Sequence, residues 1–437
     1  MKIRPRLVGS GGCSSIFFVS ELAQASIGAV GAAMASFIGT ATSSDPPEVV
    51  VDRALSSAWF GASLRPIGWE LPPAWDSVAG DYQGLDGWIR LHTNAPDHRL
   101  AVLEVLAAKE ERAAVIQAVA HWSVNQLEEA IVAAGGASAA MRSLDQWRVH
   151  PQGRAVSSEP LLDAEKTNTS ESDLVLTGLA LGRPLQGVRI LDLTRVLAGP
   201  VATRTLAGWG ASVLRIDPPD WDEPGVIPEV MPGKRTARLD LRRNGDREVF
   251  LELLRTADVL VHGYRPGALD ALGLGPEVRR QTRPGLVDVS LDAYGWTGPW
   301  KGRRGFDSLV QMSCGIADAG MNASPSDHPV PLPVQALDHA TGYIIAAATI
   351  SGLTQRLVEG SGSSWQTSLA RIANLLIDGG TQSSDAESHG TELAISDEVE
   401  KTSWGNAHRL VAPIKVAGAR FGWELPARRL GMDLAAW

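Results

Sequence analysis

The sequence lacks the cysteines that a disulfide framework or a zinc site would need. Its 437 residues contain only two, Cys13 and Cys314. They lie far apart in the chain and fit no metal-ligand or disulfide spacing. We therefore expect a reducing, cytoplasmic compartment and no metal.

Long basic runs and strongly apolar runs are also missing. Lys and Arg number 40 against 49 Asp and Glu, for a net charge of −9, so a nucleic-acid partner is not expected. The one apolar stretch, residues 16–38, is interrupted by Glu21 and Gln24 and otherwise consists mostly of Ala, Gly and Ser. We interpret it as a close-packed, buried helix rather than a membrane anchor.

Familiar catalytic motifs are absent as well. The chain contains no G-x-S-x-G, H-E-x-x-H or P-loop. The turn Arg195–Pro200 follows a predicted strand where a dinucleotide-binding protein would carry G-x-G-x-x-G, and the three glycines are not there. This disfavours a nicotinamide or flavin enzyme, although Asp217 at the end of the next strand could still resemble a ribose-binding acid.

The middle of the chain does show a clear pattern. With 44% hydrophobic residues, the chain can bury a large core. Short β-rich runs alternate with helical patterns, which predicts a doubly wound, parallel-sheet (Rossmann-like) α/β domain. The expected strands are 188–194, 211–217, 259–263 and 286–291, and the expected helices are 200–208 and 247–256.

Composition suggests the boundaries of this domain. Polar stretches at 163–183 and 379–400 read as linkers. They separate a small α+β block at 1–162, the Rossmann-like domain at 184–378 and a return segment at 401–437. In the first block we expect a helix at 20–38, strands at 47–52 and 88–92, and helices near 96–106, 109–121 and 125–134.

The two ends of the chain resemble each other. The pentapeptide Gly68–Pro72 (GWELP) returns as Gly422–Pro426. The Ala/Gly-rich helix near 25–38 has a counterpart at 340–353, with matches at Gly28 and Gly342 and at two alanine pairs. Fragments of one ancestral module thus occur at both ends.

Candidate binding residues follow the predicted strands. Arg195 lies at a helix start, which can bind an anion, but a solvated loop arginine is an equally good interpretation. Tyr264 and Arg265 follow another strand and belong to the edge of the sheet where ligands bind. Tyr294 and Trp296 lie in a Gly-rich turn after a third strand. Each alone would more often be an ordinary turn residue.

Asp338 is the candidate nucleophile. It lies directly before a long apolar helix, where Asp is a favoured N-cap. The functional alternative is a carboxylate nucleophile whose covalent intermediate is stabilised by neighbouring backbone N–H groups. From the residues alone, both interpretations stay open.

Five ordered motifs resemble one family, the class III CoA-transferases (CaiB/BaiF family), which includes carnitine and formyl-CoA transferases and α-methylacyl-CoA racemases. The matching segments are Leu185–Pro200, Leu206–Asp217, Gly233–Leu241, Ala257–Gly267 and Leu337–Asp338. The resemblance covers about 170 residues.

The resemblance implies a CoA-transferase that moves CoA from an acyl-CoA thioester to a carboxylic acid. It implies that Asp338 attacks the thioester and forms an aspartyl-CoA intermediate. It also implies coenzyme A as part of the substrate and a homodimer. The motif positions that contact CoA in relatives are here Arg195, Val196, Leu197, Ala198, Gly263, Tyr264, Arg265 and Tyr294.

The chain departs from the family pattern in three ways. The racemase branch carries a His where this chain has Phe306, which disfavours a racemase or isomerase. The small-domain-like block precedes the α/β block instead of following it. In the first block, Gln24 aligns with Asp338, so that copy supplies no nucleophile. A non-catalytic CoA-binding subunit therefore remains an alternative.

Overall fold

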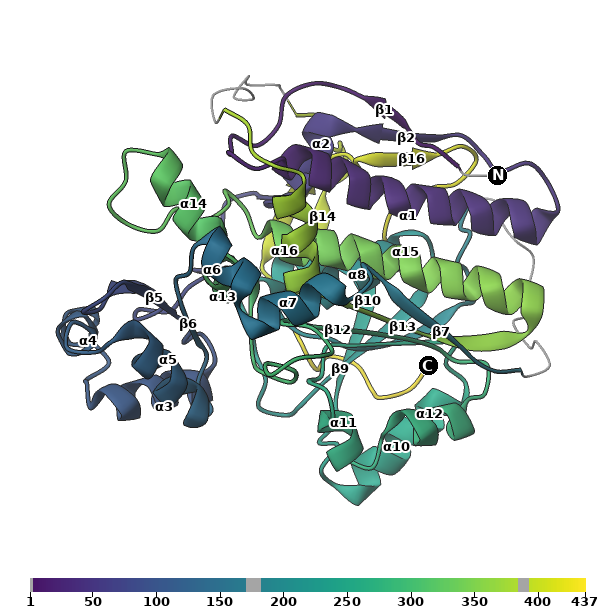
Figure 1. Cartoon of the computed structure of the whole chain (residues 1–437). Helices are drawn as coiled ribbons and strands as arrows, with labels where there is room; N and C mark the ends of the chain where they lie inside the picture. The colour runs from purple at the N-terminus through teal and green to yellow at the C-terminus, as the bar shows by residue number, and fades with distance from the viewer. Residues whose placement is uncertain (1–2, 170–181, 384–392) are drawn as a thin grey trace.

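The computed structural model describes residues 3–169, 182–383 and 393–437. Its centre is a seven-stranded sheet with strand order β10-β9-β8-β11-β12-β13-β7 (Figure 1). Six neighbouring strands run parallel, and they confirm the predicted doubly wound domain. They are β8 (Arg189–Leu193), β9 (Ser212–Asp217), β10 (Lys234–Arg238), β11 (Val259–His262), β12 (Val287–Asp292) and β13 (Ser361–Ser368).

Helices cover the two faces of this sheet. Side chains alternate between faces along each strand, so Val259 and Val261 join one buried cluster and Leu260 joins another. The first cluster includes α8 (Ala198–Gly208) and α15 (Ala336–Glu359), and the second includes α10 (Asn244–Arg255). Shorter helices are α9 (Ile227–Val230), α11 (Ala268–Ala271), α12 (Pro276–Thr282), α13 (Asp307–Ser313), α14 (Ile316–Ala323) and α16 (Leu369–Asp378).

The predicted linker at 163–183 is wrong for its first seven residues. They form β7 (Asp163–Thr169), which pairs antiparallel with β13 at the edge of the sheet. An edge strand keeps much of its surface in water, so its polar composition resembles that of a linker. Residues 170–181 lie outside the described residues, as do residues 384–392 of the second predicted linker.

A separate lobe lies on the left of Figure 1. It combines an antiparallel sheet of β4 (Gly80–Gln83), β5 (Trp88–Leu91) and β6 (Ser138–Ala140) with α3 (Pro96–Leu106), α4 (Arg112–Val119) and α5 (Val124–Ala133). The lobe has its own hydrophobic cluster. The three helices confirm the expected α+β pattern, and α6 (Leu144–Val149) and α7 (Pro151–Ser158) lead back to the large sheet.

The rest of the first block belongs to the main body and not to the lobe. Helix α1 (Val19–Thr42), β2 (Val49–Asp52) and α2 (Arg53–Trp59) share the main hydrophobic cluster with α15. Strand β2 pairs with β1 (Arg6–Val8) and β16 (Ile414–Val416). Helix α1 is long and apolar enough to cross a membrane, but 72% of its most apolar window is buried inside the protein, as expected for a core helix.

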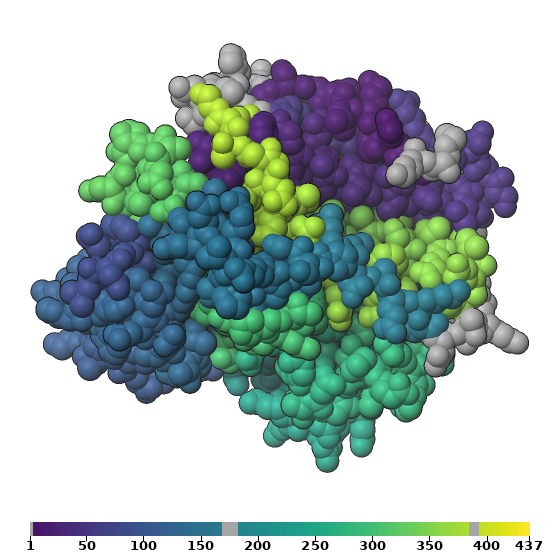
Figure 2. Space-filling model, in the orientation of Figure 1, coloured from purple at the N-terminus to yellow at the C-terminus, as the bar shows by residue number. Residues whose placement is uncertain are grey.

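The return segment adds β14 (Glu400–Thr402) and β15 (Gly405–Arg409), which form a small sheet with β3 (Leu64–Pro66). The first and last parts of the chain are therefore interleaved. Figure 2 shows the protein from outside, with the purple N-terminal segment above the green residues of α15 and the blue lobe at one side.

A buried ion cluster joins the three parts of the chain. Glu229 accepts hydrogen bonds from Arg204 on α8, from Arg409 on β15 and from the backbone N–H of Leu64 on β3. Burial raises the pKa of Glu229, but Arg409 and Arg204 outweigh this effect and lower it to about 2. Glu229 is thus ionised at neutral pH. Removing it would leave Arg204 without its carboxylate partner, whereas Arg409 would keep its ion pair with Glu400.

Candidate active site

Asp338 is the third residue of α15 and only 8% exposed. The helix begins after Gln335, whose side chain makes no capping bond. The N-cap interpretation of Asp338 is therefore wrong, because Asp338 lies inside the first turn. Its carboxylate is close to the positive end of the helix dipole.

Asp307 on α13 takes over the capping role. Its Oδ2 accepts a hydrogen bond of 2.9 Å from the backbone N–H of Asp338, and its Oδ1 accepts one from Gln311. The N–H groups of Ala336 and His339 donate to the carbonyls of Val334 and Gln335. The N–H groups of residues 336, 338 and 339 therefore already have acceptors in this structure. They are not free to stabilise a covalent intermediate, contrary to what the functional interpretation of Asp338 expects.

The two carboxyl groups influence each other. Burial raises the pKa of Asp338 well above its usual range, and the charge of Asp307 raises it further. Burial also raises the pKa of Asp307, against the lowering effect of the N–H bond from Asp338. A buried pair of this kind tends to hold one proton between its two groups.

The turn Arg195–Ala198 lies directly beside α15. An ideal Cβ on Gly342 would lie only 2.5 Å from the carbonyl oxygen of Ala198, so only a glycine permits this approach of α15 to α8. Asp338 is one helical turn before Gly342. The fold thus brings the predicted nucleophile and the predicted CoA-binding turn to the same place.

Arg195 is held between two aromatic rings. Its guanidinium lies 4.6 Å from the ring centre of Trp221 and 5.3 Å from that of Tyr264, and it donates a 3.1 Å hydrogen bond to the Tyr264 hydroxyl. This placement excludes the freely solvated loop arginine. Tyr264 and Arg195 therefore form one surface, although they come from different strands.

Val196 has a strained backbone. Its φ of 63° is rare for a β-branched residue, and its N–H donates to Glu223 at 2.8 Å. Leu197 and Ala198 are buried, so only their backbone could face a ligand. Beneath the turn, Lys234 donates to Asp192 and to the carbonyl of Pro200, which fixes the start of α8.

Tyr264 and Arg265 line a cavity of about 350 Å³ at the carboxyl end of β11. Gly263 is exposed beside them. Both signs of charge surround this cavity, with Arg280 and Lys301 as further cations and Glu165 and Asp270 as anions. Its basic side chains suit a phosphate, whereas its acidic ones would oppose it.

Tyr294 lies elsewhere. It is fully buried, and its hydroxyl is 3.0 Å from Ser313 on α13. Burial raises the pKa of Tyr294 to about 12. The structure therefore does not bring its ring together with Arg195 and Tyr264 on one open surface.

The lobe reaches the site through His92. The imidazole ring stacks on Phe306 with ring centres 3.6 Å apart, and Phe306 directly precedes Asp307. His98 meets the same ring edge-on at 5.8 Å. Burial lowers the pKa of His92 to about 3 and that of His98 to about 4, and the charges of Arg304 and Arg265 contribute to the second shift.

Sequence reasoning missed several of these residues. Asp307 directly follows Phe306, the residue that stands at the His position of the racemase branch, so the sequence does show an acid beside that position. Glu223 and Trp221 lie in the loop after the second predicted strand, and nothing in their spacing indicates that they fold back onto Arg195. His92 is 214 positions away from Phe306, and only the fold reveals the contact.

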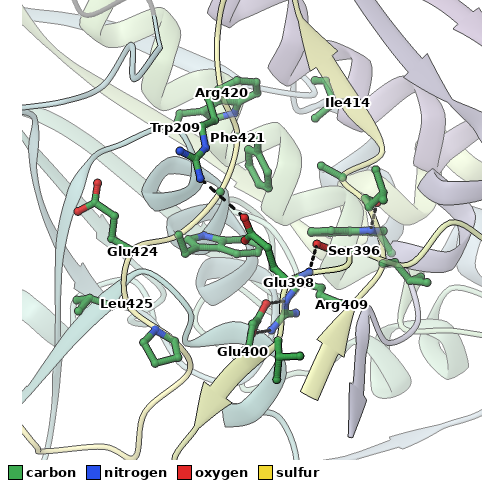
Figure 3. A pocket seen from close by; sticks show the side chains of 18 of the residues that line it. Trp209, Ser396, Glu398, Glu400, Arg409, Ile414, Arg420, Phe421, Glu424 and Leu425 are labelled. Carbon is green, nitrogen blue, oxygen red and sulfur yellow. Dashed lines mark hydrogen bonds and ion pairs between the residues drawn. The ribbon is translucent and has the colours of Figure 1, made fainter. Parts of the chain in front are cut away.

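The larger cavity is not part of this site. It measures about 520 Å³ and lies along the return segment (Figure 3). Trp59, Trp209, Arg409 and Phe421 line it together with the second GWELP copy, and none of the predicted site residues does. Within residues 3–169, 182–383 and 393–437, no group of three or more His, Cys, Asp or Glu side chains could hold a metal ion.

The sequence comparisons identify the family. A model described as CoA-transferase family III matches residues 185–423, which is more than half of the chain. The chain therefore belongs to CoA-transferase family III.

Curated relatives agree with this assignment. The human succinyl-CoA:glutarate CoA-transferase is 31% identical over 256 residues, which cover 55% of this chain and 55% of that protein. The acetyl-CoA:oxalate CoA-transferase of Acetobacter aceti is 36% identical over 145 residues, covering 30% and 37%. The chain spans about half the length, or less, of the curated relatives that it matches.

Among solved structures, that of Rv3272 from Mycobacterium tuberculosis is 32% identical, with a TM-score of 0.41 over 45% of this chain and 58% of the other. A CaiB/BaiF family protein from Brucella suis is 27% identical, with a TM-score of 0.41 over 52% and 65%.

Proposed function

We propose that the chain is an enzyme that transfers CoA from an acyl-CoA thioester to a carboxylic acid, with Asp338 as the nucleophile. The observation that carries the proposal is the placement of Asp338 against the turn Arg195–Ala198, in a chain of CoA-transferase family III. A carboxylate can act as a covalent nucleophile, and the neighbouring turn carries Arg195 as a cation for an anionic substrate.

The proposed reaction proceeds by carboxylate exchange. The Asp338 carboxylate attacks the thioester carbonyl and displaces CoA thiolate, which leaves an acyl-aspartyl anhydride. The thiolate then attacks the aspartyl carbonyl, which releases the acyl carboxylate and forms an aspartyl-CoA thioester. The acceptor carboxylate repeats these two steps in reverse order. No net proton is consumed, and Asp338 is regenerated.

Asp307 controls the charge of Asp338 in this scheme. Only an ionised carboxylate attacks a thioester, so the proton held by the pair must either be lost or reside on Asp307. Because burial and the Asp307 charge raise the pKa of Asp338, the rate should fall at acidic pH.

The CoA moiety would lie along Arg195, Tyr264 and Arg265. Arg195 would offer a guanidinium held in place by Trp221 and Tyr264, which suits a phosphate better than a mobile lysine does. Arg265 is exposed at the rim of the adjoining cavity. Val196, Leu197, Ala198 and Gly263 would contribute backbone contacts, and Tyr294 would act only from inside the core.

One observation favours a second candidate, an acyl-CoA racemase or isomerase. The racemase branch carries a His where this chain has Phe306, and His92 of the lobe places an imidazole ring on that phenyl ring. The Nδ1 atom of His92 is buried and has no hydrogen-bond partner among the described residues. A neutral imidazole there could accept an α-proton, but burial lowers its pKa to about 3, which makes it a weak base for this step. Deuterium exchange from solvent into the α-carbon of an acyl-CoA, without any acceptor acid, would identify this activity.

The experiment that tests the main proposal is a transfer assay on the purified chain. A panel of acyl-CoA donors is incubated with a panel of mono- and dicarboxylic acids, and the new thioesters are measured by mass spectrometry. Asp338→Asn keeps the size of the side chain and should abolish transfer, whereas Asp318→Asn on α14 should not. Transfer that survives Asp338→Asn would refute the role of Asp338, and transfer by the chain alone would exclude a non-catalytic subunit.

Two expectations remain predictions. One is the cytoplasmic location that the low cysteine content suggests. The other is the homodimer that the resemblance implies.

A further inference from the structure

The turn Arg195–Ala198 is held in shape by a carboxylate that lies outside all the matching motifs. Glu223 belongs to the loop after β9, and its side chain is only 9% exposed. Its Oε2 atom accepts a hydrogen bond of 2.8 Å from the backbone N–H of Val196 and one of 3.1 Å from the Nε1–H group of Trp221. One oxygen atom therefore joins the backbone of the turn to an indole ring.

Both of these bonds bear on Arg195. The N–H of Val196 belongs to the peptide group that joins Val196 to Arg195, so the first bond fixes the backbone beside Arg195. The second bond fixes Trp221, whose ring centre lies 4.6 Å from the Arg195 guanidinium. Within the described residues, no hydrogen bond or ion pair joins Glu223 to Arg195 itself. Glu223 therefore orients the guanidinium without neutralising it.

The backbone of Val196 needs such a contact. Its φ of 63° is a conformation that β-branched residues rarely adopt, and strain of this kind persists only where the surroundings hold the residue in place. A backbone N–H that donates to a carboxylate forms a charge-assisted hydrogen bond, which is stronger than one between neutral groups. The bond from Val196 to Glu223 thus stabilises the strained conformation.

Glu223 is itself fixed from below. Arg215 on β9 is fully buried and donates to the Oε1 atom of Glu223 and to both carboxylate oxygens of Asp217. Burial raises the pKa of Glu223, and Arg215 acts against this effect. Both oxygens of Glu223 therefore accept from donors, Oε1 from a cation and Oε2 from two N–H groups. An amide could not replace this carboxylate, because its NH2 group would face a donor on one of the two sides.

We propose that Glu223 is a positioning residue for the CoA-binding turn, because it holds Val196 in its strained conformation and Trp221 against Arg195. The proposal rests on the proposed function, since the orientation of Arg195 matters only if this turn binds CoA. An arginine that is already ordered loses less conformational freedom when it binds a phosphate. Glu223 thus acts on the affinity for CoA through two neighbours and does not touch the ligand.

The test is the dissociation constant of free coenzyme A, measured by calorimetry on the full chain. Glu223→Gln keeps the size of the side chain and should weaken CoA binding by about tenfold, because one set of bonds to a charged group is lost. The matched control is Asp258→Asn. Asp258 is also buried, and it accepts a backbone N–H bond from Arg189 and a side-chain bond from Arg356, but at the amino end of the strands. Both variants should lower Tm, and only Glu223→Gln should change the affinity for CoA.

Two further variants separate the two contacts. Glycine adopts a φ of 63° without strain, so Val196→Gly added to Glu223→Gln should recover part of the lost affinity. A double variant that binds CoA no better than Glu223→Gln would overturn the route through Val196. Trp221→Leu leaves the buried charges in place and should also weaken CoA binding, because Arg195 loses the ring beneath it. Unchanged affinity in Trp221→Leu would overturn the route through Trp221.

The outcomes distinguish this proposal from the proposed function. Equal CoA affinity in Glu223→Gln and the unmodified chain would overturn the proposal and leave the proposed function standing. An equal loss of affinity in Asp258→Asn would also overturn it, because the effect would then follow from lower stability alone. An unmodified chain that binds no CoA would instead refute the proposed function, and the role of Glu223 with it.

Discussion

Gly342 allows a direct test of the packing of α15 on α8, because Gly28, its match in the sequence repeat, can serve as a control. An added Cβ would lie 2.5 Å from the Ala198 carbonyl oxygen and 2.9 Å from Val201. Normal contact requires about 3.5 Å, so Gly342→Ala must move α15 away from α8 by about 1 Å. Overpacking of this kind costs about 1–3 kcal/mol.

The control is Gly28→Ala. Gly28 matches Gly342 in the sequence repeat, but the atom nearest to its added Cβ is Pro5 Cγ at 3.5 Å, an ordinary contact. Both substitutions gain about 1 kcal/mol of helix propensity. This gain cancels in the comparison, so the difference between the variants measures the close approach alone, about 1–3 kcal/mol.

The assay is urea unfolding at pH 7 together with the rate of CoA transfer. Gly28→Ala should be at least as stable as the unmodified chain and equally active. Gly342→Ala should be less stable than Gly28→Ala and lose up to about 100-fold in rate, because a shift of about 1 Å misplaces Asp338 relative to the Arg195 turn. Equal stability and equal activity of the two variants would refute the described packing of α15 on α8.

Three further predictions concern charges. Asp307→Asn keeps an oxygen that can accept a hydrogen bond from Asp338 N–H but removes the charge that raises the pKa of Asp338. The acid limb of the kcat/KM profile should therefore move to lower pH. An acid limb that does not move would show that the Asp307 charge does not influence Asp338. Glu229→Ala should lower the free energy of unfolding, measured in urea at pH 7, by about 3–5 kcal/mol. Because the pKa of Glu229 is lowered on folding, its stabilising contribution is present above about pH 4.5 and fades towards pH 2. A cost that stays constant across this pH range would contradict this assignment. Burial raises the pKa of Asp292 to about 7, so its ionisation destabilises the fold as the pH rises from about 4 to 7. Asp292→Asn should therefore be more stable than the unmodified chain at pH 8 and similar to it at pH 4. A gain in stability of equal size at both pH values would argue against this cause.

The parallel sheet was predictable because its strands are short apolar runs between helical patterns. Val259–Val261 is buried on both faces, so it carries the β signal without interruption. In Val287–Val289 the buried Asp288 stands between the two valines. Strand β7 escaped prediction because a strand at the edge of a sheet stays polar. The separation of α1 from the lobe also escaped, since sequence order groups segments that the fold places in different bodies.

For the candidate site, sequence could supply the residues of local motifs but not the contacts between distant ones. Asp338 and Arg195 each lie at the end of a recognisable element. The Asp307–Asp338 hydrogen bond joins positions 31 apart, and the His92–Phe306 stack joins the lobe to the main body. Tyr294 shows the opposite case, because a turn aromatic that looked open to a ligand fills the core instead.

The most direct test of the central claim is the mass of the intact protein after incubation with an acyl-CoA donor and no acceptor. The account predicts a covalent adduct on Asp338, either acyl or CoA, that hydroxylamine removes and that is absent from Asp338→Asn. Peptide mapping should place the adduct on the peptide that contains the start of α15. An adduct that persists in Asp338→Asn, or that maps to another residue, would contradict the account.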